Sequence, residues 1–330
     1  MRKLASIQKI RSLEPIEGAD AIEKAQVLGW QLVVKKGEFK VGDLCVYCEI
    51  DCIMPDKSEF AFLKPRKMRI RTVKLRGQVS QGICFQLSVL PKGVEISENL
   101  DVTDILGVEK FEPPIPASLE GKMKGRFPSF IPKTDEPRIQ VMQDFLDQYQ
   151  GEKCYITEKI DGSSVTYYIN NDEFGVCSRN LELLEDDTNT LWKLAHELDI
   201  ENKLRSLNKN FAIQGEIVGE NIQKNTLKLR GQIVFFFNAF DIDAYKYIDF
   251  KEFVSLMKSL ELKPVPIIEE EYILENDINK LVEMSIGKSL INPNGWREGI
   301  VIRSQKEQFI NGERFSFKVV NPKFLLKYDG

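Results

Sequence analysis

The chain has 330 residues, more than one small module needs, and this length favours two domains. The composition is 42% hydrophobic and 29% charged, which is typical of a globular protein. The sequence has no apolar run near the ~20 residues that span a bilayer, so we expect a soluble, intracellular protein. The opening MRKLASIQKI lacks the apolar core of a signal peptide. The single histidine, His196, excludes sites built on several imidazoles, and it lies on a predicted helix where packing or exposure is expected.

Residues 1–110 are expected to form a nucleic-acid-binding domain. They contain 18 basic and 15 acidic side chains, net +3, whereas the rest of the chain has 28 basic and 35 acidic, net −7. Short alternating runs such as GWQLVVKKGEFKVGD and QVSQGICFQL are separated by Gly and Asp. This pattern predicts a small closed β-barrel of the oligonucleotide-binding (OB) type.

A basic stripe lies within this domain. It has seven cations and no acid: Lys64, Arg66, Lys67, Arg69, Arg71, Lys74 and Arg76. Such stripes commonly bind phosphate backbones, although a solvated strand face is an equally good interpretation of the pattern alone. We take Lys67, Arg69, Arg71 and Arg76 as candidate nucleic-acid contacts.

Six cysteines in such a chain favour free thiols. Cys45, Cys48 and Cys52 lie in the strand-like LCVYCEIDCIMP, and small core or edge thiols are favoured there over a metal site.

Residues 111–137 contain six prolines and predict a linker or extended wrapping segment.

Residues 138–330 mix strands and helices in an α+β pattern, without regular βαβ alternation. Helices are predicted for 138–150, 187–207, 249–260 and 276–286. KLRGQ occurs at 74–78 and again at 228–232, which we interpret as two unrelated Arg-Gly turns. IGKSL at 286–290 is no phosphate-binding P-loop, because Val282 stands where the first glycine is required.

The most informative stretch for chemistry is TEKIDGSS at 157–164. Lys159 ends a predicted strand just before a Gly turn, with Thr157 and Asp161 on the same face. An amine there becomes a nucleophile only if desolvation or neighbouring cations lower its pKa. Polar groups from elsewhere in the chain must therefore converge on it.

Polar motifs do follow in order: Ser178-Arg179-Asn180, Gln214-Gly215-Glu216, Phe237-Asn238-Ala239-Phe240-Asp241, Arg297-Glu298-Gly299-Ile300-Val301-Ile302 and Ser316-Phe317-Lys318. Together with KIDG they resemble the motif series of the covalent nucleotidyltransferases, the ATP-dependent polynucleotide ligases and mRNA-capping enzymes. TEKIDGSS, TDEPRIQ and the N-terminal PIEGADAIE, VVKKGEFKVGD and EID are similar to the Deinococcus-type RNA ligases. That branch places an OB-like domain before a ligase-type, ATP-grasp-like catalytic domain of antiparallel sheets and helices, so the resemblance covers nearly the whole chain.

The resemblance implies a three-step joining of RNA ends. Lys159 would attack the α-phosphorus of ATP and expel pyrophosphate; AMP would move to a 5′-phosphate end; and a 3′-OH would then attack and release AMP. RNA ends, and by preference nicked duplex RNA or an RNA–DNA hybrid, would be the partners of a monomeric enzyme without a membrane.

The same resemblance assigns roles. Glu216 and Glu298 would be essential acids that bind ribose hydroxyls or Mg²⁺ or Mn²⁺, and Lys318 would neutralise the α-phosphate and help keep Lys159 deprotonated. Phe237 would stack on adenine, with Phe235 as its rival. The remaining cofactor-binding candidates are Glu158, Ile160, Ser164, Arg179 and the upstream phosphate-binding Arg138.

Two departures from the family pattern keep alternatives open. Ser316 stands where a second lysine is common, and Lys323 is a possible substitute. The chain also ends soon after Lys318, without the C-terminal OB domain of capping enzymes and typical DNA ligases. A DNA ligase or capping-type enzyme remains one alternative, and an OB-domain RNA-binding protein without catalysis is the other.

Overall fold

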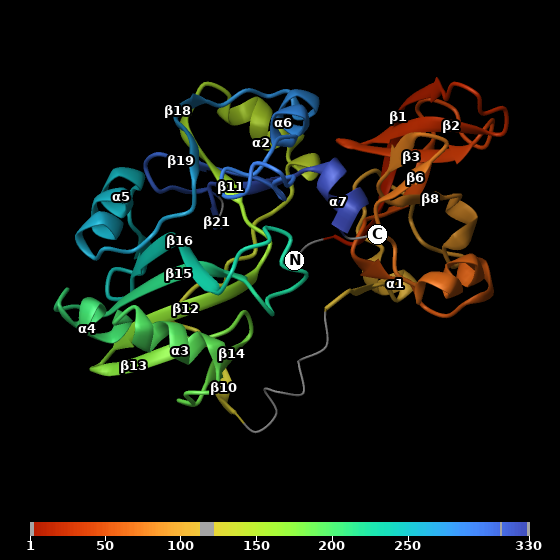
Figure 1. Ribbon diagram of the computed structural model, residues 1–330. Helices are drawn as coiled ribbons and strands as arrows, with labels where there is room; N and C mark the ends of the chain where they lie inside the picture. The colour runs from red at the N-terminus through yellow and green to blue at the C-terminus, as the bar shows by residue number, and fades with distance from the viewer. Residues whose placement is uncertain (1–2, 113–121, 311, 329–330) are drawn as a thin grey trace.

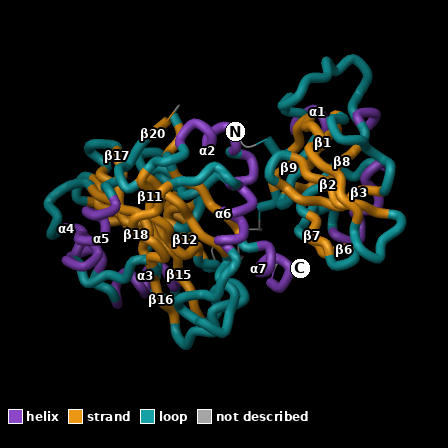
Figure 2. The backbone as a smooth tube through the Cα atoms, turned by 90° about the horizontal axis from the view of Figure 1, so that it is seen from above, coloured by secondary structure: helices purple, strands orange, loops and turns teal. Residues whose placement is uncertain are grey.

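The computed structural model describes residues 3–112, 122–310 and 312–328. Its ribbon forms two bodies: the N-terminal strands gather in one, and the remaining chain builds a larger body with the C-terminal helix between the two (Figure 1). Seen from above, strands occupy the middle of both bodies and most helices lie outside them (Figure 2). No helix in the described ranges is long and apolar enough to cross a membrane.

The N-terminal body is a five-stranded antiparallel sheet in the order β3-β2-β1-β4-β8. Its strands are β1 (Ala5–Pro15), β2 (Ile22–Val27), β3 (Trp30–Lys35), β4 (Leu44–Cys48) and β8 (Ile83–Phe85). Smaller pairs join β5 (Cys52–Ile53) to β9 (Glu109–Lys110) and β6 (Val73–Leu75) to β7 (Gln78–Ser80). Alternate apolar side chains of these strands, such as Ile7, Ala25 and Leu32, are completely buried and form the core of this body.

The basic stripe is not one strand. Its first part lies in the 3₁₀ helix η1 (Ser58–Arg66), and its last part lies on the β6–β7 hairpin, whose turn contains Arg76. Cys45, Cys48 and Cys52 are buried free thiols, and no metal-binding group of acids, cysteines and His196 is found in the described residues. Burial raises the pKa of the Cys48 thiol, as expected for an inert core cysteine.

The larger body packs two antiparallel sheets. One has the order β18-β11-β19-β22 and the other β10-β14-β13-β12-β15-β16-β17. The first contains β11 (Lys153–Lys159), β18 (Ile267–Ile273), β19 (Gly299–Ser304) and β22 (Ser316–Val320). The second contains β10 (Met123–Arg126), β12 (Ser163–Asn170), β13 (Glu173–Cys177), β14 (Leu181–Leu183), β15 (Phe211–Gly219), β16 (Gln232–Asp241) and β17 (Lys246–Tyr247). A further hairpin joins β20 (Phe309–Ile310) to β21 (Glu313–Arg314).

Short helices cover the sheets. They are η2 (Leu87–Val89) and α1 (Thr103–Leu106) in the first body, and η4 (Ile139–Val141), α2 (Gln143–Tyr149), α3 (Thr190–Glu197), α4 (Ile200–Arg205), α5 (Phe250–Ser259), α6 (Ile278–Ser285) and α7 (Pro322–Tyr328) in the second. The predicted helices near 249–260 and 276–286 are confirmed. The single helix predicted over 187–207 is wrong, because Asp199 adopts a left-handed backbone (φ 52°) and starts α4 afresh.

The predicted linker 111–137 does more than connect. Residues 113–116, with three of its prolines, lie outside the described residues. Met123–Arg126 form β10, which pairs with β14 at the edge of the seven-stranded sheet. The extended stretch that follows runs along the larger body, where Gln214 donates to the carbonyl of Pro132 (2.9 Å).

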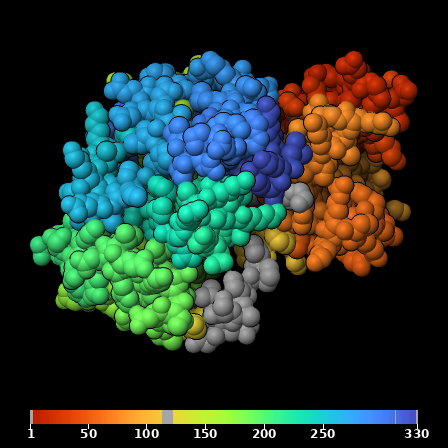
Figure 3. Space-filling model, viewed as in Figure 1, coloured from red at the N-terminus to blue at the C-terminus, as the bar shows by residue number. Residues whose placement is uncertain are grey.

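The two bodies are joined by specific contacts. Asp51 bonds Arg138 (2.6 Å) and Arg69 (2.7 Å), and the Arg138 guanidinium lies 5.8 Å from the Trp30 ring centroid. Leu325 of α7 belongs to the buried core of the N-terminal body. The space-filling view shows the two bodies in contact along one side (Figure 3).

Candidate active site

Strand register brings Lys159 and Lys318 to the same end of one sheet. In β11 and β19, Lys159 pairs with Gly299, and in β19 and β22, Val301 pairs with Lys318. Gly299 is required between them, since a Cβ there would lie 2.2 Å from the Val319 carbonyl oxygen. The local sequence therefore sets the nucleophile candidate beside the motif at the end of the chain.

Three carboxylates surround the Lys159 amine. Its Nζ bonds the Glu298 carboxylate at 2.7 Å, and Glu216 and Asp161 are close enough to act on its charge. Burial acts to lower the pKa of Lys159, but Glu298 and Glu216 outweigh it and the pKa is raised. The low pKa expected of a lysine nucleophile is therefore not found, and the amine is protonated in this arrangement.

The pKa values of two neighbouring acids, Glu216 and Asp161, are also raised, mainly by burial. Burial raises the pKa of Glu216 to about 8; Lys159 opposes the shift and Glu298 adds to it. Burial, with Glu298 adding, raises the pKa of Asp161 to about 6. This end of the pocket thus concentrates more negative charge than one lysine can neutralise.

The Gly turn after Lys159 carries the chain from one sheet to the other. A Cβ on Gly162 would lie 2.2 Å from the Ile217 carbonyl oxygen, so only glycine fits this crossing. On the second sheet, Ser164 pairs with Glu216, and the Ser164 hydroxyl donates to the Glu216 carboxylate (3.2 Å). The turn therefore fixes Glu216 opposite Lys159.

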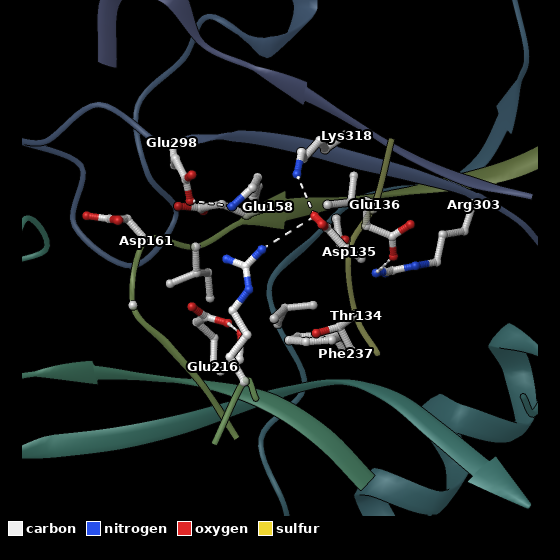
Figure 4. A pocket seen from close by; sticks show the side chains of 18 of the residues that line it. Thr134, Asp135, Glu136, Glu158, Asp161, Glu216, Phe237, Glu298, Arg303 and Lys318 are labelled. Carbon is white, nitrogen blue, oxygen red and sulfur yellow. Dashed lines mark hydrogen bonds and ion pairs between the residues drawn. The ribbon is translucent and has the colours of Figure 1, made fainter. Parts of the chain in front are cut away.

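The opposite end of the pocket is basic and centres on Asp135. Three cations approach its carboxylate: Lys318 at 3.4 Å, Arg179 at 3.6 Å and Lys110, from the N-terminal body, at 2.8 Å. Burial acts to raise the pKa of Asp135, but these cations hold it well below its usual range. Figure 4 shows Asp135 and Lys318 on one side of the pocket and Glu298 and Asp161 on the other.

Phe237 lines the pocket and Phe235 does not. Gln214 pairs with Asn238 and Gly215 with Phe236, so Phe237 is the extra residue of a β-bulge in β16. Bulges re-aim side chains and are frequent beside active sites. Ile160 and Val265 provide further apolar lining, giving a flat ring a place to bind.

In the last motif, Ser316 takes the position where related enzymes commonly have a second lysine. Ser316 is completely buried and accepts a hydrogen bond from Arg303 (3.0 Å), and Arg303 lines the pocket while paired with Glu136 (3.0 Å). Lys323 does not line the pocket and lies 5.3 Å from the Trp296 ring centroid. The position of Lys323 therefore does not support it as the substitute, and the cation beside Ser316 in the pocket is Arg303.

The pocket, a cavity of about 290 Å³, unites most of the predicted residues. It is lined by Glu158, Lys159, Ile160, Ser164, Arg179, Glu216, Phe237, Glu298 and Lys318. Arg138 is the exception, since its side chain is buried against Asp51 and Trp30 at the boundary between the bodies. Position therefore does not support the phosphate-binding role predicted for Arg138.

The four candidate nucleic-acid contacts lie outside the pocket. Lys67 and Arg76 are exposed, whereas Arg69 and Arg71 are partly buried. Arg69 is engaged twice, with Asp51 and with the Phe111 ring at 3.8 Å from its centroid. Lys67 and Arg76 are therefore the more accessible of these four candidates.

Comparison with known proteins identifies the family. An RNA ligase family model matches residues 152–320, and an OB-fold domain model matches residues 4–87. The chain belongs to the RNA ligase family. This confirms the predicted fold class, an N-terminal OB-fold domain followed by a ligase domain.

Solved structures extend the match over the whole length. A Naegleria gruberi RNA ligase variant with ATP and Mn is 40% identical, with a TM-score of 0.91 and 99% of each chain covered. A variant of that ligase with AMP and Mn is 40% identical, has a TM-score of 0.90 and covers 99% of each chain. The same enzyme with PPi is 40% identical, has a TM-score of 0.90, and covers 100% of this chain and 99% of its own. No curated protein matches the chain.

Several lining residues were not predicted from the sequence. They are Thr134, Asp135, Glu136, Gln223, Val265, Val301 and Arg303. The position of Arg303 in the pocket could have been predicted, because alternate residues of a strand, here 299, 301 and 303, face the same side. Asp135 had none, since nothing in the local sequence indicates that three cations converge on it.

Proposed function

We propose that this member of the family is an ATP-dependent RNA ligase of the Deinococcus-type branch, in which Lys159 of a KxDG motif is the nucleophile. The observation that carries the proposal is the partly buried Lys159 amine, held 2.7 Å from Glu298 in a pocket that is acidic at one end and basic at the other. We further propose residues 1–110, 111–137 and 138–330 as OB domain, linker and adenylyltransferase domain.

The first step forms a bond from Lys159 Nζ to the α-phosphorus of ATP and breaks its bond to the bridging oxygen, so that pyrophosphate leaves. The amine must lose its protons in this step, and Glu298 is the carboxylate within hydrogen-bond distance to accept one. Phe237 would stack on adenine, with Glu158, Ile160 and Ser164 as neighbours; Lys318 and Arg179 would bind phosphate.

The charge around Lys159 explains why a divalent cation belongs in the proposal. Glu216 and Glu298 offer hard oxygen ligands, and a cation bound there would favour the ionised form of Glu216, whose pKa is raised by burial and by Glu298. Two carboxylates with substrate phosphates suffice for Mg²⁺ or Mn²⁺, although the described residues hold no group of three ligands. When bound, such a cation stabilises charge on the transferring phosphate.

The second and third steps join the RNA ends. A 5′-phosphate oxygen attacks the lysyl-AMP phosphorus and releases Lys159; the 3′-OH then attacks the activated 5′-phosphorus and releases AMP. We propose nicks in duplex RNA or RNA–DNA hybrids as the substrate, with the basic stripe binding the flanking backbone. Exposed Lys67 and Arg76 suit that role best, followed by Arg71; Arg69 is already committed to Asp51.

The test uses α-labelled ATP, with labelled GTP as comparison, and Mg²⁺ or Mn²⁺. Wild type should acquire covalent label from ATP, and Lys159→Ala should acquire none. Label that persists in Lys159→Ala would remove Lys159 as the nucleophile, and preferential labelling by GTP would favour a capping-type enzyme. Nicked duplexes with RNA or DNA on either side of the break then separate RNA sealing from DNA sealing.

A second variant tests the division of labour between the domains. Arg76→Ala with Lys67→Ala should weaken sealing but leave self-adenylylation at the wild-type rate, because both side chains lie outside the ATP pocket. An equal loss of both activities would show that the basic stripe does not act through RNA.

A further inference from the structure

A loop beside the pocket combines unusual backbone geometry with unpaired positive charge. Residues 220–231 connect β15 to β16. Four of its residues that are not glycine adopt the left-handed region: Asn221 (φ 63°), Gln223 (φ 47°), Asn225 (φ 42°) and Lys228 (φ 51°). Such conformations are disfavoured for residues with a Cβ and persist where the surroundings fix them, often at functional sites.

The surroundings of this loop do fix it. The Asn225 amide bridges the backbone of Leu229, accepting from its N–H (3.1 Å) and donating to its carbonyl (3.0 Å). Leu227 is buried, and its carbonyl accepts from Asn292 (2.9 Å). The loop is therefore a rigid element, anchored from within and from beneath.

The inner side of the loop contacts the turn that follows Lys159. The Thr226 hydroxyl donates to the Asp161 carboxylate (3.2 Å), and the Gln223 amide donates to the Gly162 carbonyl (3.4 Å). Gln223 also lines the pocket. A molecule bound along the outside of this loop would therefore lie next to the reacting centre.

The outer side of the loop is basic. Lys224, Lys228 and Arg230 are exposed, and none forms an ion pair with any acid among residues 3–112, 122–310 and 312–328. The sequence from 221 to 231 contains no Asp or Glu. Elsewhere around the pocket the cations are neutralised, as Lys318 is by Asp135 and Lys159 by Glu298. In Figure 3 the turquoise surface of this region lies on the viewed face, between the catalytic body and the orange N-terminal body.

We propose that loop 220–231 is a phosphate-backbone contact for the RNA strand next to the end being joined, made through Lys228 and Arg230. The inference rests on the proposed function and deepens it, by adding an RNA-binding element in the catalytic domain to the one in the OB domain. Cations on an ordered backbone suit polyanion binding for two reasons: the loop loses little conformational freedom on binding, and the RNA backbone releases its condensed counterions.

The experiment compares Lys228→Gln/Arg230→Gln with Lys251→Gln/Lys258→Gln. The control pair removes two exposed lysines without ion pairs from α5, which lies away from this loop in Figure 1. Sealing of a nicked RNA duplex is measured with pre-adenylylated enzyme over a range of RNA and salt concentrations. The loop variant should have on the order of tenfold higher KM for RNA, and its log–log salt slope should be smaller by about one for each lost contact.

Self-adenylylation by the loop variant should equal that of wild type, and the control pair should match wild type throughout. Lys228→Arg/Arg230→Lys keeps both charges and should restore RNA binding. If the loop variant is less stable in thermal melting, Arg230→Gln alone gives the same comparison. A loop variant with wild-type KM and salt slope would overturn this inference, whereas a wild type that takes no label from ATP would overturn the proposed function.

Discussion

The two ends of the pocket are built on opposite charge patterns. At one end a single cation, Lys159, lies among three carboxylates; at the other a single carboxylate, Asp135, lies among three cations. The first arrangement raises the pKa of its central lysine, because the carboxylates outweigh the effect of burial. In the second arrangement the three cations outweigh the effect of burial, so the pKa of Asp135 is lowered.

This difference teaches how charge at the two ends of one pocket can suit a metal–nucleotide complex. The acidic end has excess negative charge, which suits a divalent cation, and the basic end has excess positive charge, which suits phosphate. Lys159 and Asp135 act as internal counter-ions until the substrate arrives. Substrate binding is then an exchange of ionic partners, with little exposure of unpaired charge to an apolar environment.

The largest effect should come from removing charge at the acidic end. Glu298→Gln keeps the shape but loses both the cation ligand and the acceptor for the Lys159 proton, so self-adenylylation should fall by at least about 10²-fold. The measurement is the single-turnover rate of label transfer from ATP at saturating Mn²⁺. Glu275→Gln, which alters a half-buried acid that pairs with Lys280 outside the pocket, is the matched control. A variant within threefold of wild type would contradict the role given to Glu298.

An intermediate effect is expected from pH. The pKa of Glu216, raised to about 8 by burial despite opposition from Lys159, lies above its unfolded value. Its neutral form therefore contributes stability that is complete below the unfolded pKa and is lost as pH rises through about 8. Glu216→Gln removes this loss, so its thermal midpoint should exceed that of wild type by about 2–4 °C at pH 9 and match it near pH 4.

Catalysis should show the opposite trend to stability. Ionised Glu216 and a deprotonated Lys159 are both favoured at higher pH, so the adenylylation rate should rise between pH 6 and pH 9. A rate that falls over this range would contradict the proposed charges of the two groups.

The smallest effect should come from the basic end. Asp135→Asn removes the internal counter-ion of Lys318, so ATP phosphates no longer compete with it, and KM for ATP should fall about threefold. The exposed carboxylate contributes at most about 1 kcal/mol to folding at neutral pH, so the thermal midpoint should change little. Asp147→Asn is a control outside the pocket. An increase in KM would show that Asp135 is needed to position Lys318.

The sequence predicted this site unevenly, for physical reasons. Residues that work through strand position could be predicted, since period-two alternation and motif order bring Lys159, Glu298 and Lys318 together. Residues that depend on packing between distant segments could not, as with Asp135 and the ion pair of Arg303 with Glu136. Arg138 was misplaced because its partner, Asp51, comes from the other domain.

The fold followed the same rule. Both domains and their strands were predicted from local alternation, whereas the break between α3 and α4 depends on one backbone conformation at Asp199. The choice of Phe237 over Phe235 depends on a bulge that no pattern in the sequence announces.

The position of α7 has a consequence for how the protein is made. Leu325 of α7 and Val320 of the preceding strand β22 complete the core of the N-terminal domain, although the whole ligase domain separates them from it in the sequence. That domain leaves the ribosome long before they do, and domains generally begin to fold as they emerge. The core of the N-terminal domain is therefore completed only after the ligase domain has been synthesised, and the packing of α7 couples assembly of the first domain to synthesis of the second.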